Sequence, residues 1–148
     1  MKMAPSFLDD IDQIQRWTDA DPYHNGQHSP EWWLTGGGVL AFRLDDNLGA
    51  VFYAKIVQEG NQFRMHCQFA PSEEVSKRRV VCGILWALPR LIGHFMDEGE
   101  ALVFNSISPS LVNFFLSQGF TPGDGGDYVY SFKETSCLDA DLRPMKNS

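Results

Sequence analysis

The sequence has few cysteines and no pattern among them. Cys67, Cys82 and Cys137 are the three in 148 residues, an odd number at wide spacing. Such a set argues against a disulfide framework and against a four-cysteine zinc site. It is typical of a protein kept in a reducing compartment, and we therefore expect a cytoplasmic protein.

Long hydrophobic runs are also missing. The longest apolar stretch, Val80–Met96, is interrupted by Pro89, Arg90 and His94. It is too short and too interrupted to span a bilayer, and it predicts a buried helix instead. The start of the chain has one lysine followed by two aspartates, which is not the pattern of a signal peptide. We expect no membrane partner.

Positive charge is in deficit. The chain has 12 Lys and Arg against 19 Asp and Glu, a formal net charge of −7. Nonspecific nucleic-acid binding depends on neutralising phosphates, so we expect no nucleic-acid partner. A local basic patch could still bind one small anion. Six of the acids lie in the first 31 residues, which predicts an acidic face on that side of the molecule.

What the chain does contain is enough for one globular domain. Apolar residues make up 43% and aromatic residues 13%, which suits a core built from large side chains. We expect a single domain over residues 1–134 and a polar C-terminal tail over residues 135–148.

The first half predicts one helix, a loop and three strands. Apolar residues recur at helical spacing from Leu8 to Trp17, with Ser6 as the expected N-cap. A long polar and aromatic loop follows, ending at the glycines before residue 39. Short turns then separate three apolar runs, which predicts an antiparallel meander. The runs are Val39–Leu44, Ala50–Val57 and Gln62–Ala70.

The second half alternates helices and strands. A long helix is predicted over Ser76–Asp97, with a kink at Pro89, and the short apolar strand Ala101–Asn105 follows it. A second helix begins at Pro109, and Tyr128–Phe132 alternates as a last strand. The order predicts an α/β fold, with a mixed, mostly antiparallel sheet flanked by helices and one βαβ unit.

This order resembles the GNAT family, the Gcn5-related N-acetyltransferases, from about Gly38 to Phe132. The apolar strand ending at Asn105, followed by a short helix and the pair Gly119-Phe120, matches the family's pattern. A second match is the end of the third predicted strand, where Pro71 precedes a basic cluster and the long helix. The resemblance implies a GNAT-like fold.

The resemblance also implies a function. Members are acyl-CoA-dependent N-acyltransferases that transfer acetyl from acetyl-CoA to an amine acceptor by direct attack. The implied partners are therefore acetyl-CoA and an amine, from a small molecule or a protein. The positions that correspond to the family's cofactor site are Phe69, Ala70, Lys77, Arg78, Arg79, Val80, Val81, Cys82, Ser108 and Phe115.

Several family positions hold other residues here. The family loop reads Gln/Arg-x-x-Gly-x-Gly/Ala, and this chain has Val80 at the first glycine and Cys82 at the second. Phe115 stands where many members have a tyrosine acid, and Ser108 where an asparagine contacts pantetheine. Almost no sequence precedes the first helix to form the family's first strand. These differences favour the alternative of a catalytically silent GNAT-like binding or assembly module, for example of viral or mobile-element origin.

The position of the basic cluster at a helix start favours an anion site on physical grounds as well. Lys77, Arg78 and Arg79 open a helix, where cations oppose the helix dipole by roughly 0.3–1 kcal/mol each. A bound anion would reverse that sign, because free backbone N–H groups converge on it. The alternative is a solvated charge run paired with Glu73 and Glu74.

His66 is the candidate general base. It lies on the third predicted strand, and histidine titrates near the pH at which an amine must lose its proton. The alternative is a packed or surface histidine. Cys67, on the other strand face, could act as a nucleophile in a hydrolase, but no histidine and acid lie at a diagnostic spacing from it. We expect Cys67 to be a core residue.

Trp32 and Trp33 are candidates for the wall of the acceptor site, with simple packing as the alternative. Nearby, His24 and His28 have a spacing that suits a metal only on a helix. The intervening Asn-Gly predicts a turn, and no third ligand is evident. We expect no metal site.

Overall fold

One seven-stranded sheet forms the centre of the protein. The computed structural model describes residues 1–23 and 28–132. Its strands lie in the order β1-β2-β3-β4-β5-β7-β6, and all neighbours are antiparallel except β4 and β5. The strands are β1 (Lys2–Ala4), β2 (Leu40–Asp46), β3 (Gly49–Glu59), β4 (Gln62–Phe69), β5 (Ala101–Asn105), β6 (Thr121–Pro122) and β7 (Asp127–Ser131). This α/β architecture confirms the predicted fold class.

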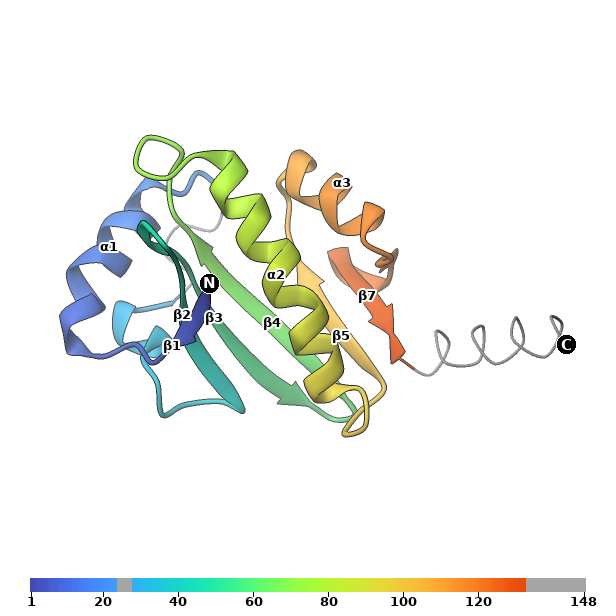
Figure 1. Ribbon diagram of the computed structural model, residues 1–148. Helices are drawn as coiled ribbons and strands as arrows, with labels where there is room; N and C mark the ends of the chain where they lie inside the picture. Colours follow the sequence, from blue (N-terminus) through green and yellow to red (C-terminus); the bar gives the residue numbers. More distant parts are fainter. Residues whose placement is uncertain (24–27, 133–148) are drawn as a thin grey trace, which may run out of the picture.

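Helices cover both faces of the sheet (Figure 1). The three α-helices are α1 (Ile11–Ala20), α2 (Lys77–Phe95) and α3 (Pro109–Ser117), and the short 3-10 turns are η1 (Leu8–Asp10), η2 (Pro30–Trp33) and η3 (Asp124–Gly126). Strand alternation sends neighbouring side chains to opposite faces. None of the described helices is both long and apolar enough to cross a bilayer.

Ring contacts identify which helix covers which face. Phe63 of β4 packs on Phe95 of α2, with ring centroids 4.5 Å apart. Tyr53 of β3, on the opposite face, packs 5.5 Å from Trp17 of α1. α2 and α3 therefore share one face, and α1 covers the other.

The start of the chain differs from the prediction. Three residues are enough to form β1, which pairs antiparallel with residues 43–45 of β2, so the expected absence of a first strand is wrong. Ser6 does not cap a helix, because its hydroxyl donates to the carbonyl oxygen of Trp33 at 3.0 Å. Leu8 is 75% exposed and takes no part in the core. Contacts with chain segments distant in sequence decide all three outcomes.

α2 lies close against the sheet. Its buried residues include Ile84, Leu88 and Leu91, as the apolar spacing predicted, but Leu85 is 44% exposed. Gly83 is buried instead, and a Cβ there would lie 2.6 Å from the Cδ2 atom of Leu44. The helix approaches the sheet through this glycine.

The parallel pair β4–β5 creates an opening in the sheet. The two strands pair over residues 62–65 and 101–104. β4 then continues to Phe69, whereas β5 ends at Asn105. The last four residues of β4, from His66 onward, therefore have no partner on β5. The predicted βαβ unit is confirmed, with α2 as its crossover.

Candidate active site

The larger of two cavities at this opening lies between the end of β4, the start of α2 and α3. Its volume is about 520 Å³. The lining includes six of the residues expected to bind the cofactor, namely Phe69, Ala70, Lys77, Val80, Val81 and Ser108. The backbone N–H of Ala70 donates to the carbonyl oxygen of Val51 at 3.1 Å, so it is not free for a ligand.

The first turn of α2 supplies the polar end of this cavity. Ser76 is the N-cap, and its side-chain oxygen accepts from the backbone N–H of Arg79. The backbone N–H groups of Lys77 and Arg78 belong to the first helical turn and have no acceptor within the helix. The side chain of Lys77 lines the cavity. A cation and the positive end of a long helix therefore meet at one point, an arrangement that favours an anion.

Arg79 is bonded to a carboxylate outside the larger cavity. Its guanidinium makes two bonds of 2.7 Å to the carboxylate of Asp46, at the β2–β3 turn. Arg79, and to a lesser degree the backbone N–H of Leu48, hold the pKa of Asp46 down to about 2, against a smaller opposing effect of burial. Of the two glutamates that could pair with a charge run, Glu74 is bonded to Arg16 at 2.7 Å.

Besides Arg79, three of the residues predicted to bind the cofactor lie outside the described lining of the larger cavity. Arg78 and Cys82 are exposed on α2. Phe115 is 1% exposed and lies in the core, stacked 4.3 Å from Phe104 and edge-on to Phe120. Phe115 thus fills the space under α3 and presents nothing to a ligand.

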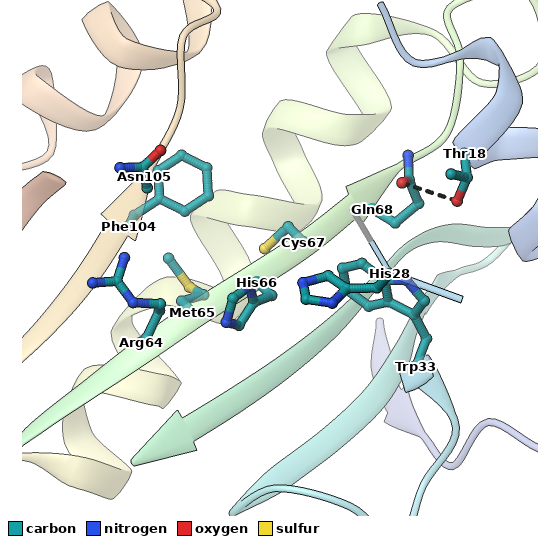
Figure 2. Close-up of a pocket in the computed structure, with 10 residues that line it drawn as sticks. All are labelled: Thr18, His28, Trp33, Arg64, Met65, His66, Cys67, Gln68, Phe104 and Asn105. Carbon is teal, nitrogen blue, oxygen red and sulfur yellow. Dashed lines mark hydrogen bonds between the residues drawn. The ribbon is translucent and has the colours of Figure 1, made fainter. Parts of the chain in front are cut away.

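The smaller cavity lies where β4 leaves β5, and Figure 2 shows its lining. Its volume is about 210 Å³. The lining residues come from α1, the loop before η2, η2, β4 and β5. They are Thr18, His28, Trp33, Arg64, Met65, His66, Cys67, Gln68, Phe104 and Asn105.

His66 lies at the middle of this cavity. Its ring is 5.2 Å from the ring of His28 and 4.9 Å from that of Trp32, edge-on to both. Burial, and secondarily the nearby charges of His28 and Arg64, lower the pKa of His66 to about 4. The imidazole is therefore neutral at neutral pH and can accept a hydrogen bond or a proton.

Trp32 packs edge-on against His66 but does not belong to the described lining of the smaller cavity. His28 stacks on its indole with ring centroids 3.6 Å apart. The ammonium of Lys55 lies 4.3 Å from the Trp32 ring centroid and donates to the Trp32 carbonyl oxygen at 2.7 Å. Trp33, which is 4% exposed, contributes the neighbouring surface of the cavity. The two predicted tryptophans are brought together with the predicted histidine.

Lys55 is a residue that sequence reasoning missed. It is 7% exposed and pairs across the strands with His66. A Cβ on Gly37 would lie 2.7 Å from its ammonium nitrogen, so the glycines before β2 leave room for this lysine. A lysine alternating with apolar residues along a strand is the signal that could have identified it.

Gln68 and Arg64 were also missed. Gln68 is 2% exposed, accepts from the hydroxyl of Thr18 at 3.2 Å and donates to Asp21 at 3.2 Å (Figure 2 shows the first bond). Arg64 makes a two-bond fork to Asp127, at 2.9 and 3.0 Å. Both residues join β4 to other elements beside the smaller cavity.

Other chemistries find little support at this site. Burial raises the pKa of the Cys67 thiol to about 12, which keeps it protonated and unreactive. Among residues 1–23 and 28–132, no three His, Cys, Asp or Glu side chains are grouped to hold a metal. His24, of the weighed metal pair, lies outside the described residues.

The comparisons with known proteins give the fold. No family model matches the sequence, and no curated protein matches it. Among solved structures, the ribosomal-protein-S18-alanine N-acetyltransferase from Escherichia coli superposes with a TM-score of 0.61 at 14% identity, over 88% of this chain and 93% of that one. A GCN5-related N-acetyltransferase from Kribbella flavida gives 0.59 at 15% identity, over 88% and 94%. A putative phosphinothricin N-acetyltransferase gives 0.58 at 12%, over 88% and 94%. The chain has the GNAT fold of these N-acetyltransferases.

Proposed function

We propose that this GNAT-fold protein is an N-acyltransferase that uses acetyl-CoA and an amine acceptor. The observation that carries the proposal is the pair of cavities at the end of β4, where this strand still pairs with β3 but no longer with β5. Phe69 lines the larger cavity and His66, Cys67 and Gln68 line the smaller one, so adjacent residues of one strand serve both. Such a strand can hold a donor and an acceptor close together.

The larger cavity fits a coenzyme A group. The first-turn N–H groups of α2 and the Lys77 ammonium would hold the pyrophosphate. Val80, Val81, Leu111 and Phe114 line the same cavity and offer an apolar surface to the pantetheine arm. The bound thioester would supply the acetyl group.

The smaller cavity would hold the acceptor. His66, neutral at neutral pH, would accept a hydrogen bond from the amine and orient its lone pair. A histidine of such low pKa is a weak base, so the proton that the amine loses would pass on to water. Trp33 and Phe104 would exclude bulk water from two sides of the amine.

A catalytically silent binding module is the second candidate. Phe115 has no proton to donate and lies in the core, and Val80 limits backbone approach where the family has glycine. Such a protein would bind coenzyme A without turnover, or would not bind it.

Calorimetric titration with acetyl-CoA and with coenzyme A tests the proposal. We expect binding in the micromolar range. Lys77→Ala should weaken it by about tenfold, which is about 1.4 kcal/mol, because one cation near the phosphates is lost. Glu73→Gln should tighten it, since Glu73 is an exposed acid on the same lining.

Arg79→Ala separates the roles within the basic cluster. We expect it to lower stability while leaving coenzyme A affinity within about twofold, because Arg79 is bonded to Asp46. The absence of heat at high micromolar ligand would eliminate the enzyme proposal. Binding without release of free thiol in the presence of a panel of amines would favour the silent module.

A further inference from the structure

No acid belongs to the lining of the smaller cavity as the structure describes it. Arg64 is the one charged side chain among the described residues that line it. Of the acids near the start of the chain, Asp10 is bonded to Arg43 at 3.0 Å and to the Tyr53 hydroxyl at 2.7 Å, and Asp21 accepts from the Gln68 side-chain amide at 3.2 Å without itself lining the cavity. An incoming ammonium would therefore find no carboxylate of the described lining to pair with.

Two of the acids close to the cavity are bonded to Arg64. Arg64 bonds Glu59 at 3.0 Å and Asp127 at 2.9 Å, and neither acid belongs to the described lining. The charges around His66 act mainly against its protonation. Arg64 and Lys55 both lower the pKa of His66, and only Glu59 raises it. Positive charge inside this cavity is disfavoured.

The indole of Trp32, which lies beside His66 outside the described lining, already has a cation over it. A ring of indoles and imidazoles could bind an ammonium through cation–π contacts. Here the ammonium of Lys55 already lies over Trp32, and His28 stacks on the same indole. At Trp32, therefore, the chain itself supplies the cation that the indole binds.

From these contacts we propose that the smaller cavity takes its acceptor as the uncharged amine, and that the acceptor is a compact, weakly basic primary amine and not a polyamine or other alkylammonium. The assignment of the cavity to the acceptor rests on the proposed function. A volume of about 210 Å³ is below that of cavities that bury drug-sized ligands, which limits the acceptor to a small group. Binding the neutral amine also makes a strong general base unnecessary.

An isosteric pair of probes tests the charge preference without any need for turnover. Choline and 3,3-dimethylbutan-1-ol have the same shape and differ by one positive charge. Each is titrated into the full chain, and binding is followed by the NMR shift of the Trp33 indole N–H, which reports on this cavity. We expect the alcohol to bind at least about tenfold more tightly than choline. Equal or tighter binding of choline would overturn the proposal, and so would a Trp33 signal that neither probe moves.

Arg64 variants locate the source of the preference. Arg64→Gln frees the charges of Glu59 and Asp127, and we expect the alcohol-to-choline affinity ratio to fall several-fold toward one. Arg64→Lys keeps the cation and should keep most of the ratio, while Arg90→Gln on the exposed side of α2 should leave it unchanged. An unchanged ratio in a folded Arg64→Gln protein would overturn the role of Arg64.

The wild-type comparison stands even if that variant fails to fold. The outcome of the choline and 3,3-dimethylbutan-1-ol titrations can also be separated from the outcome of the coenzyme A titration. Discrimination by the pair without any coenzyme A binding would leave the charge preference intact and remove the acyltransferase. Coenzyme A binding with choline preferred would do the reverse.

Discussion

At the residue scale, one strand position decides between chemistry and packing. His66 and Cys67 are neighbours on β4, and alternation sends them to opposite faces. Both are perturbed by burial, in opposite directions because burial disfavours the charged form of each. The histidine is held neutral and the thiol is held protonated, so His66 is left as the residue able to accept a proton.

The low pKa of His66 predicts a pH-dependent stability. Its folded-state pKa of about 4 is below the ordinary value of 6.5. Below about pH 6.5 the unfolded chain binds a proton that the folded chain does not bind until about pH 4. The free energy of unfolding should therefore fall by about 2 kcal/mol from this group between about pH 7 and pH 5.

Urea unfolding of the wild type and of His66→Gln at both pH values measures this contribution. In His66→Gln the side chain at this position cannot titrate, so most of the fall in the free energy of unfolding that His66 causes between these pH values should disappear. His94→Gln, an exposed histidine on α2, is the matched control and should keep it. Parallel pH dependence in wild type and His66→Gln would show that His66 titrates normally.

At the scale of the element, α2 is held by two different contacts. Arg79 fastens its first turn to the β2–β3 turn through Asp46. Further along, Gly83 lets the helix backbone approach Leu44 and Phe52. Together these contacts hold the first half of α2 against the sheet.

Two glycines of the same helix should respond oppositely to alanine. Gly83→Ala places a Cβ 2.6 Å from Leu44 and 3.2 Å from Phe52, so we expect a loss of about 1–3 kcal/mol in the free energy of unfolding. A Cβ at the exposed Gly93 meets nothing within 4 Å, so Gly93→Ala should gain about 0.5–1 kcal/mol from helix propensity. Thermal or urea unfolding measures both, and a stabilising Gly83→Ala would show that α2 can shift freely.

At the scale of the whole molecule, the sheet has two antiparallel parts joined by one parallel seam. β4 and β5 share four register pairs at that seam. The side chain of Arg64 reaches across β5 to Asp127 on β7, adding a charged link between the two parts. This link lies beside the point where the strands diverge.

Removing the Arg64–Asp127 ion pair should weaken the contact between the two antiparallel parts of the sheet. Arg64 is the main influence that lowers the pKa of Asp127, so the pair stabilises the fold at pH above the ordinary aspartate value and loses its effect as Asp127 is protonated. We expect Asp127→Asn to lower the free energy of unfolding by about 1–2 kcal/mol at neutral pH, and by less as the pH falls below about 3.8. Asp124→Asn, at an exposed position in the same loop, is the control. A constant difference between Asp127→Asn and wild type across that range would contradict an ionic link.

Local patterns predicted most of the elements. Ala101–Asn105 is a strand at both predicted ends, and α3 starts at Pro109 as expected. The long helix was predicted from Ser76, which the structure shows as the N-cap of α2, one residue before its start. β1 and β6 were missed because strands of three and two residues carry too little pattern and exist through pairing with β2 and β7. The kink at Pro89 stays a prediction.

The candidate site was predictable in part. Lys77, Val80 and Ser108 line the larger cavity, but Arg79 faces Asp46 and Phe115 faces Phe104. A run of three basic residues on a helix necessarily points in three directions, and the sequence does not show which partner lies in each. The acidic face expected near the start of the chain stays a prediction, and the described lining of the smaller cavity has no acid.

Sequence patterns alone were enough for the order of the longer strands and helices, the parallel crossover through α2 and a basic helix start, because periodicity, turns and caps act between residues a few positions apart. The tertiary structure decided which charges remain available. Arg64, Arg79 and Lys55 are each bonded to groups at least 22 positions away, apart from the Arg64–Glu59 pair. A charge in a folded protein acts through its nearest partners, and those partners are set by the packing of distant segments.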